Sequence, residues 1–299
     1  MLTKFFQYTE IKTKITSTFT FAYTLAFLLY QGNKIDWLRT LLFFSAMFLF
    51  DLTTTAINNY IDSKDNGQIL SFDRKTALFI IYILFILSTI LGLSLAYLSD
   101  LVILAAGAVC FACGVFYTYG PIPISRQPLG ELFSGFFYGF MIPFILLYIN
   151  TPAGTFLNYD LTMTGLSLNL FFIPFLVLLI FSVIPFAVTA NIMLANNICD
   201  LEKDVTVKRF TLPYYIGRSA IGLFAGLYLL TYVVNIIMVV IGIFPPVSLL
   251  ALLSVIPVWK NIKIFIEKQS KEETFICSIK NFIWIMGTNS LFLFIGYLL

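Results

Sequence analysis

The sequence contains no histidine, and that absence narrows the chemistry open to it. Without imidazole there is no histidine general base and no histidine-ligated metal, so oxygen atoms are the expected ligands of any bound metal. Cysteine is also scarce, and four residues do not suggest a disulfide framework. Cys110 and Cys113 form a C-x-x-C inside an apolar run, where we expect inert thiols because redox motifs need an accessible thiolate.

Charge is the next scarce property. Only 11% of the residues are charged, about half the share of a soluble domain, while 60% are hydrophobic. The apolar runs are continuous and long enough to cross a lipid bilayer. The sequence therefore predicts an all-α polytopic membrane protein with one transmembrane domain over residues 1–299. The formal net charge of +3 is spread over the loops and indicates no nucleic-acid partner.

We expect about nine transmembrane helices bundled around a central cavity. The candidate spans share continuous apolar character and lie near residues 16–30, 38–60, 77–98, 101–117, 132–149, 171–191 and onward, 220–243, 246–259 and 279–299. The stretch 260–280 mixes isoleucine and phenylalanine with lysine and glutamate. That amphipathic pattern predicts a segment at the membrane interface or in solution.

The positions of lysine and arginine predict a cytoplasmic N-terminus. In that orientation 16 of the 18 basic residues lie on the inner side, and only Lys34 and Arg39 fall toward the outer side. Such a bias sets the topology of membrane proteins, whereas acidic residues contribute little to it. We expect an integral protein of the plasma membrane of a bacterium.

Two acidic segments, 58–66 and 196–204, directly follow long apolar runs. Together they hold five of the 15 acidic residues, and both face the cytoplasm in the predicted topology. Charged groups at the mouth of a membrane bundle are costly and usually functional. Within each segment the oxygen-bearing residues recur every four positions, which places them on one helical face.

Two such oxygen stripes that face each other across a cavity predict a shared Mg²⁺ site. The predicted ligands are Asn58, Asp62, Asn196, Asp200 and Asp204, with the three aspartates as the catalytic residues. Mg²⁺ is usually held by one or two carboxylates together with substrate phosphates, so the site suits a diphosphate whose departure must be assisted. Cations in the same loops are candidates to bind the remaining phosphate oxygens. They are Lys64, Arg126, Lys203, Lys208 and Arg209.

A simpler interpretation stays open for single residues. Polar residues at the end of a span often only mark topology, and this role is favoured for each lysine and arginine taken alone. For Asp51, which precedes the first segment, we expect a hydrogen-bonded partner within the bundle. Both segments begin Asn-Asn and carry an aspartate four residues after the first asparagine, and this repetition favours a site.

The two segments resemble the aspartate-rich motifs of the UbiA family of intramembrane aromatic prenyltransferases. The first family motif is approximately N-D-x-x-D-x-x-x-D, which Asn58, Tyr60 and Asp62 match. The second motif, D-x-x-x-D, is matched by Asp200 and Asp204. The resemblance implies a family fold of nine spans with both motifs on the cytoplasmic side.

Two longer stretches resemble the 1,4-dihydroxy-2-naphthoate prenyltransferases of menaquinone synthesis. They are residues 196–212, which read N-N-x-x-D-x-E-x-D-x-x-x-K-R-x-T-L, and residues 120–131, which contain G-P-I-P and L-G-E. There are also departures from the family pattern. Asn59 and Asn66 replace acidic positions, and an R-P-x-T before the first span is absent. Lys12 and Lys14 are the candidates to replace its arginine, and we expect weaker or differently placed metal binding at the first segment.

The resemblance implies a reaction. A polyprenyl group would pass from polyprenyl diphosphate to 1,4-dihydroxy-2-naphthoate with Mg²⁺ as cofactor, and loss of carbon dioxide and diphosphate would give demethylmenaquinol. Tyr60, Tyr117 and Tyr119 are candidates, by location, to contact the aromatic acceptor. Other acceptors of the family, such as 4-hydroxybenzoate or haem, stay open.

A cation-coupled transporter is the alternative from another class, because acidic residues in membrane helices also serve as relay sites. Transporters usually place such residues near the midplane in broken helices. Here the acids stand at the ends of spans beside cations, which favours phosphate chemistry.

Overall fold

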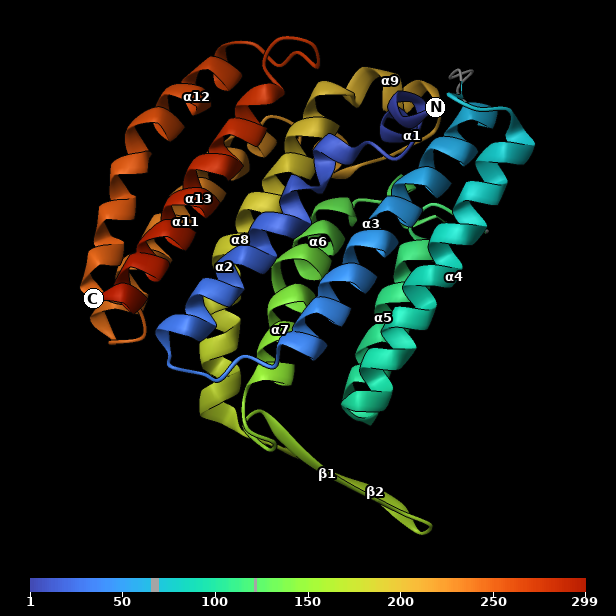
Figure 1. The fold of residues 1–299 in the computed structure, drawn as a ribbon. Coiled ribbons are helices and arrows are strands. Elements are labelled where there is room, and N and C mark those ends of the chain that lie inside the picture. Colours follow the sequence, from blue (N-terminus) through green and yellow to red (C-terminus); the bar gives the residue numbers. More distant parts are fainter. Residues whose placement is uncertain (66–69, 121–122) are drawn as a thin grey trace.

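Long helices packed side by side form the body of the computed structural model, which describes residues 1–65, 70–120 and 123–299 (Figure 1). The bundle contains α2 (Ile15–Tyr30), α3 (Trp37–Asp65), α4 (Arg74–Leu98), α5 (Leu101–Phe116), α6 (Gly130–Ser134) with the π-helix η3 (Gly135–Met141) and α7 (Ile142–Asn150), α8 (Phe172–Cys199), α11 (Ser219–Val240), the 3-10 helix η4 (Pro246–Ser254) with α12 (Val255–Glu267), and α13 (Ile276–Leu298). The short helices are α1 (Leu2–Tyr8), η1 (Ile11–Lys14), η2 (Ile124–Arg126), α9 (Leu201–Thr206) and α10 (Leu212–Ile216).

The chain is an integral membrane protein by the length and composition of its helices. Seven helices of the described chain are long and apolar enough to cross a membrane: α3, α4, α6 to α7, α8, α11, η4 to α12, and α13. The apolar helices α2 and α5 have 16 residues each and coincide with two further predicted spans. The total of nine spans and the cytoplasmic N-terminus remain predictions.

The stretch 260–280 differs from the sequence-based expectation. Residues up to Glu267 continue α12, and α13 begins at Ile276, so a short loop is all that separates two long helices. Ile262 and Phe265 are fully buried. The amphipathic pattern arises because this face packs against the bundle and not against a membrane surface.

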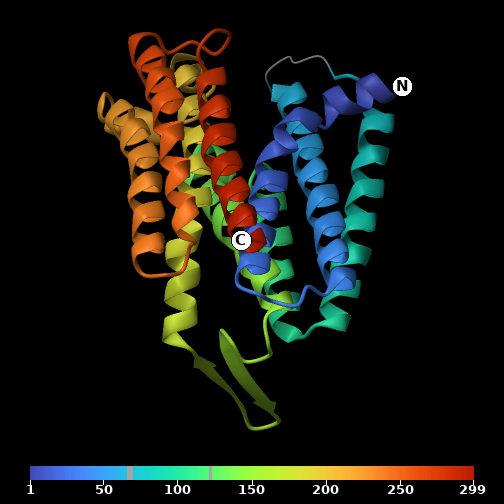
Figure 2. The same ribbon diagram turned by 60° about the vertical axis from the view of Figure 1, so that its left-hand side comes forward.

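A β-hairpin between α7 and α8 was not predicted. Strands β1 (Leu157–Thr162) and β2 (Gly165–Leu170) pair antiparallel, with Leu157 opposite Leu170. The hairpin extends from the end of the bundle opposite α1 and α9 (Figures 1 and 2).

Close packing between η3 and α8 sets one wall of the interior. A Cβ atom at Gly139 would lie 2.3 Å from backbone atoms of Phe186, so only glycine fits where these helices meet. Pro185 lies inside α8 at the same level. Lipid supplies no hydrophobic force that drives membrane helices together, so their association depends on close packing. Small residues such as glycine permit that close approach. The contact fixes η3, a helix type that often occurs at functional sites.

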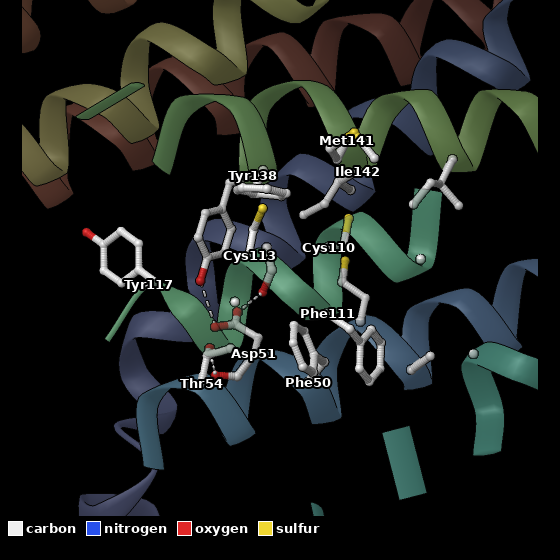
Figure 3. A pocket seen from close by; sticks show the side chains of 18 of the residues that line it. Phe50, Asp51, Thr54, Cys110, Phe111, Cys113, Tyr117, Tyr138, Met141 and Ile142 are labelled. Atoms are coloured by element: carbon white, nitrogen blue, oxygen red, sulfur yellow. Dashed lines mark hydrogen bonds between the residues drawn. The ribbon is translucent and has the colours of Figure 1, made fainter. Parts of the chain in front are cut away.

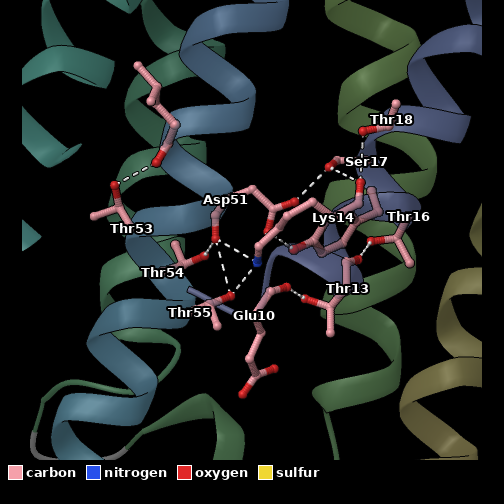
Figure 4. Close-up of polar contacts among 12 residues, drawn as sticks. Glu10, Thr13, Lys14, Thr16, Ser17, Thr18, Asp51, Thr53, Thr54 and Thr55 are labelled. Atoms are coloured by element: carbon pink, nitrogen blue, oxygen red, sulfur yellow. Dashed lines mark hydrogen bonds and ion pairs between the residues drawn. The ribbon is translucent and has the colours of Figure 1, made fainter. Parts of the chain in front are cut away.

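A buried ion pair joins the N-terminal region to α3. The Lys14 ammonium lies 2.9 Å from Asp51 Oδ1, and the two side chains are 3% and 5% exposed. The Tyr138 hydroxyl of η3 donates to the same carboxylate oxygen at 2.8 Å (Figure 3), and the Ser17 hydroxyl donates to Oδ2 at 2.7 Å (Figure 4). Lys14 also donates to the Thr55 hydroxyl. The expected partner of Asp51 within the bundle is confirmed.

Removing one member of this pair leaves a buried charge without its opposite charge. We expect Lys14→Ala to lower the free energy of unfolding by about 3–5 kcal/mol. The matched control is Lys12→Ala, an exposed lysine two residues away, which should change stability by less than about 0.5 kcal/mol. Unfolding of both variants in detergent measures the difference, and equal losses would contradict the assigned role of the pair.

Candidate functional site

A cavity of about 320 Å³ lies between α3, α4, α5, η3 and α7 (Figure 3). This volume is in the range of sites for small organic ligands. One region is apolar and includes Phe43, Leu95, Ile103, Ile142 and Ile145. The other carries polar side chains, among them Ser17, Asp51, Thr55, Asn58 and Thr118. The cavity expected from the sequence is therefore present, with an apolar and a polar region.

One face of α3 determines this change in polarity. The residues of α3 that line the cavity recur every three or four positions from Phe43 to Asn58, which corresponds to one helical stripe of about 22 Å. Phe43 and Met47 are apolar, Asp51 is charged, and Asn58 stands in the first acidic segment. The stripe therefore leads from a hydrocarbon-like interior to the first acidic segment.

The two asparagines that open this segment have different tasks. Asn58 lines the cavity, and its side-chain oxygen accepts a hydrogen bond from the Thr118 hydroxyl. The Asn59 amide donates to the Tyr8 carbonyl oxygen at 2.9 Å and to a Glu10 carboxylate oxygen at 3.2 Å, which ties α3 to α1. A carboxylate could not donate these bonds, so asparagine fits this position where the family pattern has aspartate. Asp62 is half-buried one turn beyond Asn58, and Asn66 lies outside the described residues.

The second segment keeps its helical spacing although α8 ends at Cys199. The Asp200 amide donates to the Asn196 carbonyl at 3.0 Å, and the Asp204 amide donates to the Asp200 carbonyl at 2.8 Å. The three predicted ligands therefore follow one another at intervals of one turn. Asp204 is buried, and burial raises the pKa of its carboxyl group, while the nearby Arg209 acts in the opposite direction.

Lys271 is a functional candidate that the sequence analysis missed. It stands between α12 and α13, and its ammonium donates to the Asn196 side-chain oxygen and, at 2.6 Å, to Asp200 Oδ2. Two predicted metal ligands thus point at one cation. The sequence offered no signal beyond a positive charge on the predicted inner side, because the contact spans 71 residues.

The loops that follow α5 and α9 meet beside the second segment. The Phe210 amide donates to the Arg126 carbonyl at 3.3 Å, and the Arg209 guanidinium donates to the Ser125 carbonyl at 3.4 Å. Lys203 and Lys208 are exposed near them, whereas Lys64 is exposed at the end of α3. Binding of diphosphate by these cations stays a prediction.

Glu131, at the start of α6, is a second residue whose position the sequence did not reveal. It is buried and accepts a hydrogen bond from the Asn197 amide at 2.9 Å. Its Oε2 atom has no hydrogen-bond partner among the described residues. A Cβ at Gly130 would lie 3.3 Å from the Tyr117 hydroxyl, so this corner is tightly packed. Glu131 therefore fixes Asn197, the residue that follows the predicted ligand Asn196.

Of the three predicted acceptor-binding tyrosines, one lines the cavity and two do not. Tyr117 lines the cavity. The Tyr60 ring lies under the Arg74 guanidinium, 4.4 Å from ring centroid to carbon, and Tyr119 is 63% exposed. Neither is among the residues that line the cavity, whereas Tyr138, which was not predicted, is.

The common metal site stays a prediction. Within the described ranges, no group of three or more Asp, Glu or Cys side chains is arranged to hold a metal ion. Cys110 and Cys113 line the cavity as free thiols.

Residues 19–286 match the UbiA prenyltransferase family. The 1,4-dihydroxy-2-naphthoate octaprenyltransferase of Bacillus subtilis (strain 168) is 26% identical over 250 residues, which cover 79% of this chain and 74% of that protein.

Two solved structures share the fold. A UbiA homolog from Aeropyrum pernix K1 in its apo form superposes with a TM-score of 0.66 at 16% identity, covering 94% of this chain and 98% of that one. A UbiA homolog from Archaeoglobus fulgidus bound to GPP and Mg²⁺ gives a TM-score of 0.62 at 11% identity, covering 99% of this chain and 100% of the other. With a family match over most of its length, the chain belongs to the UbiA prenyltransferase family and is a membrane prenyltransferase.

Proposed function

We propose that the protein transfers a polyprenyl group from polyprenyl diphosphate to 1,4-dihydroxy-2-naphthoate. Loss of carbon dioxide and diphosphate gives demethylmenaquinol. The observation that carries the proposal is the cavity, whose α3 wall changes from apolar at Phe43 to polar at Asn58. The relative from Bacillus subtilis supports the naphthoate acceptor over 4-hydroxybenzoate or haem. Membership of a prenyltransferase family removes the reason to consider a cation-coupled transporter.

The two regions of the cavity suit the two ends of an allylic diphosphate donor. Its apolar region accommodates a hydrocarbon chain, and its polar region lies beside the first acidic segment, where a diphosphate would bind. Phenylalanine rings line the space between, including Phe50, Phe111 and Phe137. Aromatic faces stabilise positive charge, and an apolar wall keeps water from a reactive cation. We place this site at the cytoplasmic face of a bacterial plasma membrane.

The donor set fits a magnesium ion. Every proposed ligand is an amide or carboxylate oxygen, as hard cations require. Asn196 and Asp200 already converge on the Lys271 ammonium, which stands in for a cation at this position. When bound, Mg²⁺ would neutralise negative charge on the diphosphate as it leaves. The proposed ligands are Asn58, Asp62, Asn196, Asp200 and Asp204, and the proposed contacts to the other phosphate oxygens are Lys64, Arg126, Lys203, Lys208 and Arg209.

The aspartates of both segments test the proposal. We expect Asp62→Ala, Asp200→Ala and Asp204→Ala each to lower prenyl transfer at least about 100-fold, since even partners of a metal ligand typically cost 10–100-fold. The measurement is transfer of a labelled polyprenyl diphosphate to the naphthoate in Mg²⁺. Asp160→Ala in the exposed hairpin is the control and should keep full activity. Full activity in any of the three variants would remove that residue from the metal site.

Lys271 gives a second test that needs no turnover. A metal held by Asn196 and Asp200 must displace the ammonium, so Lys271→Gln should bind Mn²⁺ several-fold more tightly, because a partly exposed ion pair is worth up to about 1 kcal/mol. Calorimetry or electron paramagnetic resonance measures this affinity without substrate. Lys268→Gln is the control, because Lys268 lies in the same loop but pairs with Glu273 at 2.5 Å. Unchanged or weaker Mn²⁺ binding by Lys271→Gln would contradict the proposal that the metal and the Lys271 ammonium occupy the same position.

A further inference from the structure

The buried ion pair of Lys14 and Asp51 lies outside both acidic segments. Both residues are almost inaccessible, yet Asp51 also lines the cavity. Charged side chains inside a membrane bundle are expensive, face interior cavities and mark functional sites. The stability of the fold accounts for the pairing, but it does not account for its place in the cavity wall.

Tyr138 connects this pair to the cavity. It lies in the π-helix η3, lines the cavity, and donates its hydroxyl proton to Asp51 Oδ1 at 2.8 Å (Figure 3). A tyrosine hydroxyl has one proton and can also accept. Because that proton is held by Asp51, the Tyr138 oxygen can only accept a hydrogen bond from a molecule in the cavity.

Ser17 and Lys14 also donate hydrogen bonds to the Asp51 carboxylate. The Ser17 hydroxyl donates to Asp51 Oδ2 at 2.7 Å, and Lys14 donates to Oδ1 and, at 3.0 Å, to the Asp51 carbonyl oxygen (Figure 4). These bonds hold the carboxylate in one orientation, which in turn fixes the Tyr138 hydroxyl. The result is a preorganised acceptor atom whose neighbours in the wall include the apolar side chains of Met141 and Ile142.

We propose that Tyr138, oriented by Asp51 and Lys14, is the subsite for a ring hydroxyl of the aromatic acceptor. The phenolic O–H donates to the Tyr138 oxygen, while the ring packs against the apolar wall. A hydroxyl that donates to a polarised oxygen makes its ring more electron-rich, which favours attack on an allylic carbon. This subsite rests on the proposed function and adds to it the group that selects a phenol.

Ligand binding tests the subsite separately from turnover. The full-length protein in detergent is titrated with 1,4-dihydroxy-2-naphthoate and with 2-naphthoate, which lacks both hydroxyls. We expect Tyr138→Phe to weaken binding of the dihydroxy compound on the order of tenfold, the worth of one hydrogen bond, and to leave 2-naphthoate unchanged. Equal losses for both ligands, or no loss for either, would overturn the proposal.

Tyr148→Phe is the matched control. The Tyr148 hydroxyl also donates to a carboxylate, Asp100 Oδ2 at 2.5 Å, but Tyr148 is not among the residues that line the cavity. This variant should bind both naphthoates like the wild type. A loss of the hydroxyl preference in Tyr148→Phe as well would overturn the proposal.

Binding of a prenyl diphosphate, measured on the same samples, distinguishes a failure of the Tyr138 subsite from a failure of the proposed function. Wild type and Tyr138→Phe should bind geranyl diphosphate equally in Mg²⁺. Wild-type protein that binds this donor but neither naphthoate overturns the subsite alone, whereas protein that does not bind the donor overturns the proposed function.

Discussion

In a bilayer, a buried charge must find its partner inside the protein, because neither lipid nor water is there to solvate it. In this chain, Lys14 and Asp51 are buried charges that satisfy each other. The pair joins the residues before α2 to the middle of α3, and through Tyr138 it reaches η3. Three parts of the sequence that are far apart are thereby held around one cavity, and the polar region of that cavity is built from the same contacts.

Helix α3 links the cavity to the first acidic segment. A single helical face carries apolar side chains, then Asp51, then Asn58, so that a molecule lying along it meets hydrocarbon first and polar side chains last. Such an order matches an amphiphilic donor with an isoprenoid tail and a diphosphate head.

The two acidic segments are unequal in a way that the structure explains. In the first segment, Asn59 is used to anchor α1, and Asn58 is bonded to Thr118. In the second segment, Asn196 and Asp200 share one cation, and Asp204 is buried beside Arg209. In the second segment, two side-chain oxygens converge on Lys271, which the loop between α12 and α13 carries. This position at the end of α8 is where we propose that a metal ion binds.

The sequence by itself determined the membrane class, the approximate limits of most long helices, the absence of histidine ligands and the family motifs. It could do so because lipid demands continuous apolar runs and because ligand spacing along a helix is local. The hairpin could also have been found, since leucine and tyrosine alternate with polar residues at Leu157, Tyr159, Leu168 and Leu170. Only the tertiary structure decided that Tyr138 faces Asp51, that Lys271 reaches Asp200, and that Tyr60 and Tyr119 lie outside the cavity. The contacts of Tyr138 with Asp51 and of Lys271 with Asp200 join residues 87 and 71 positions apart. Helix packing, which no local pattern encodes, decides which of these side chains meet.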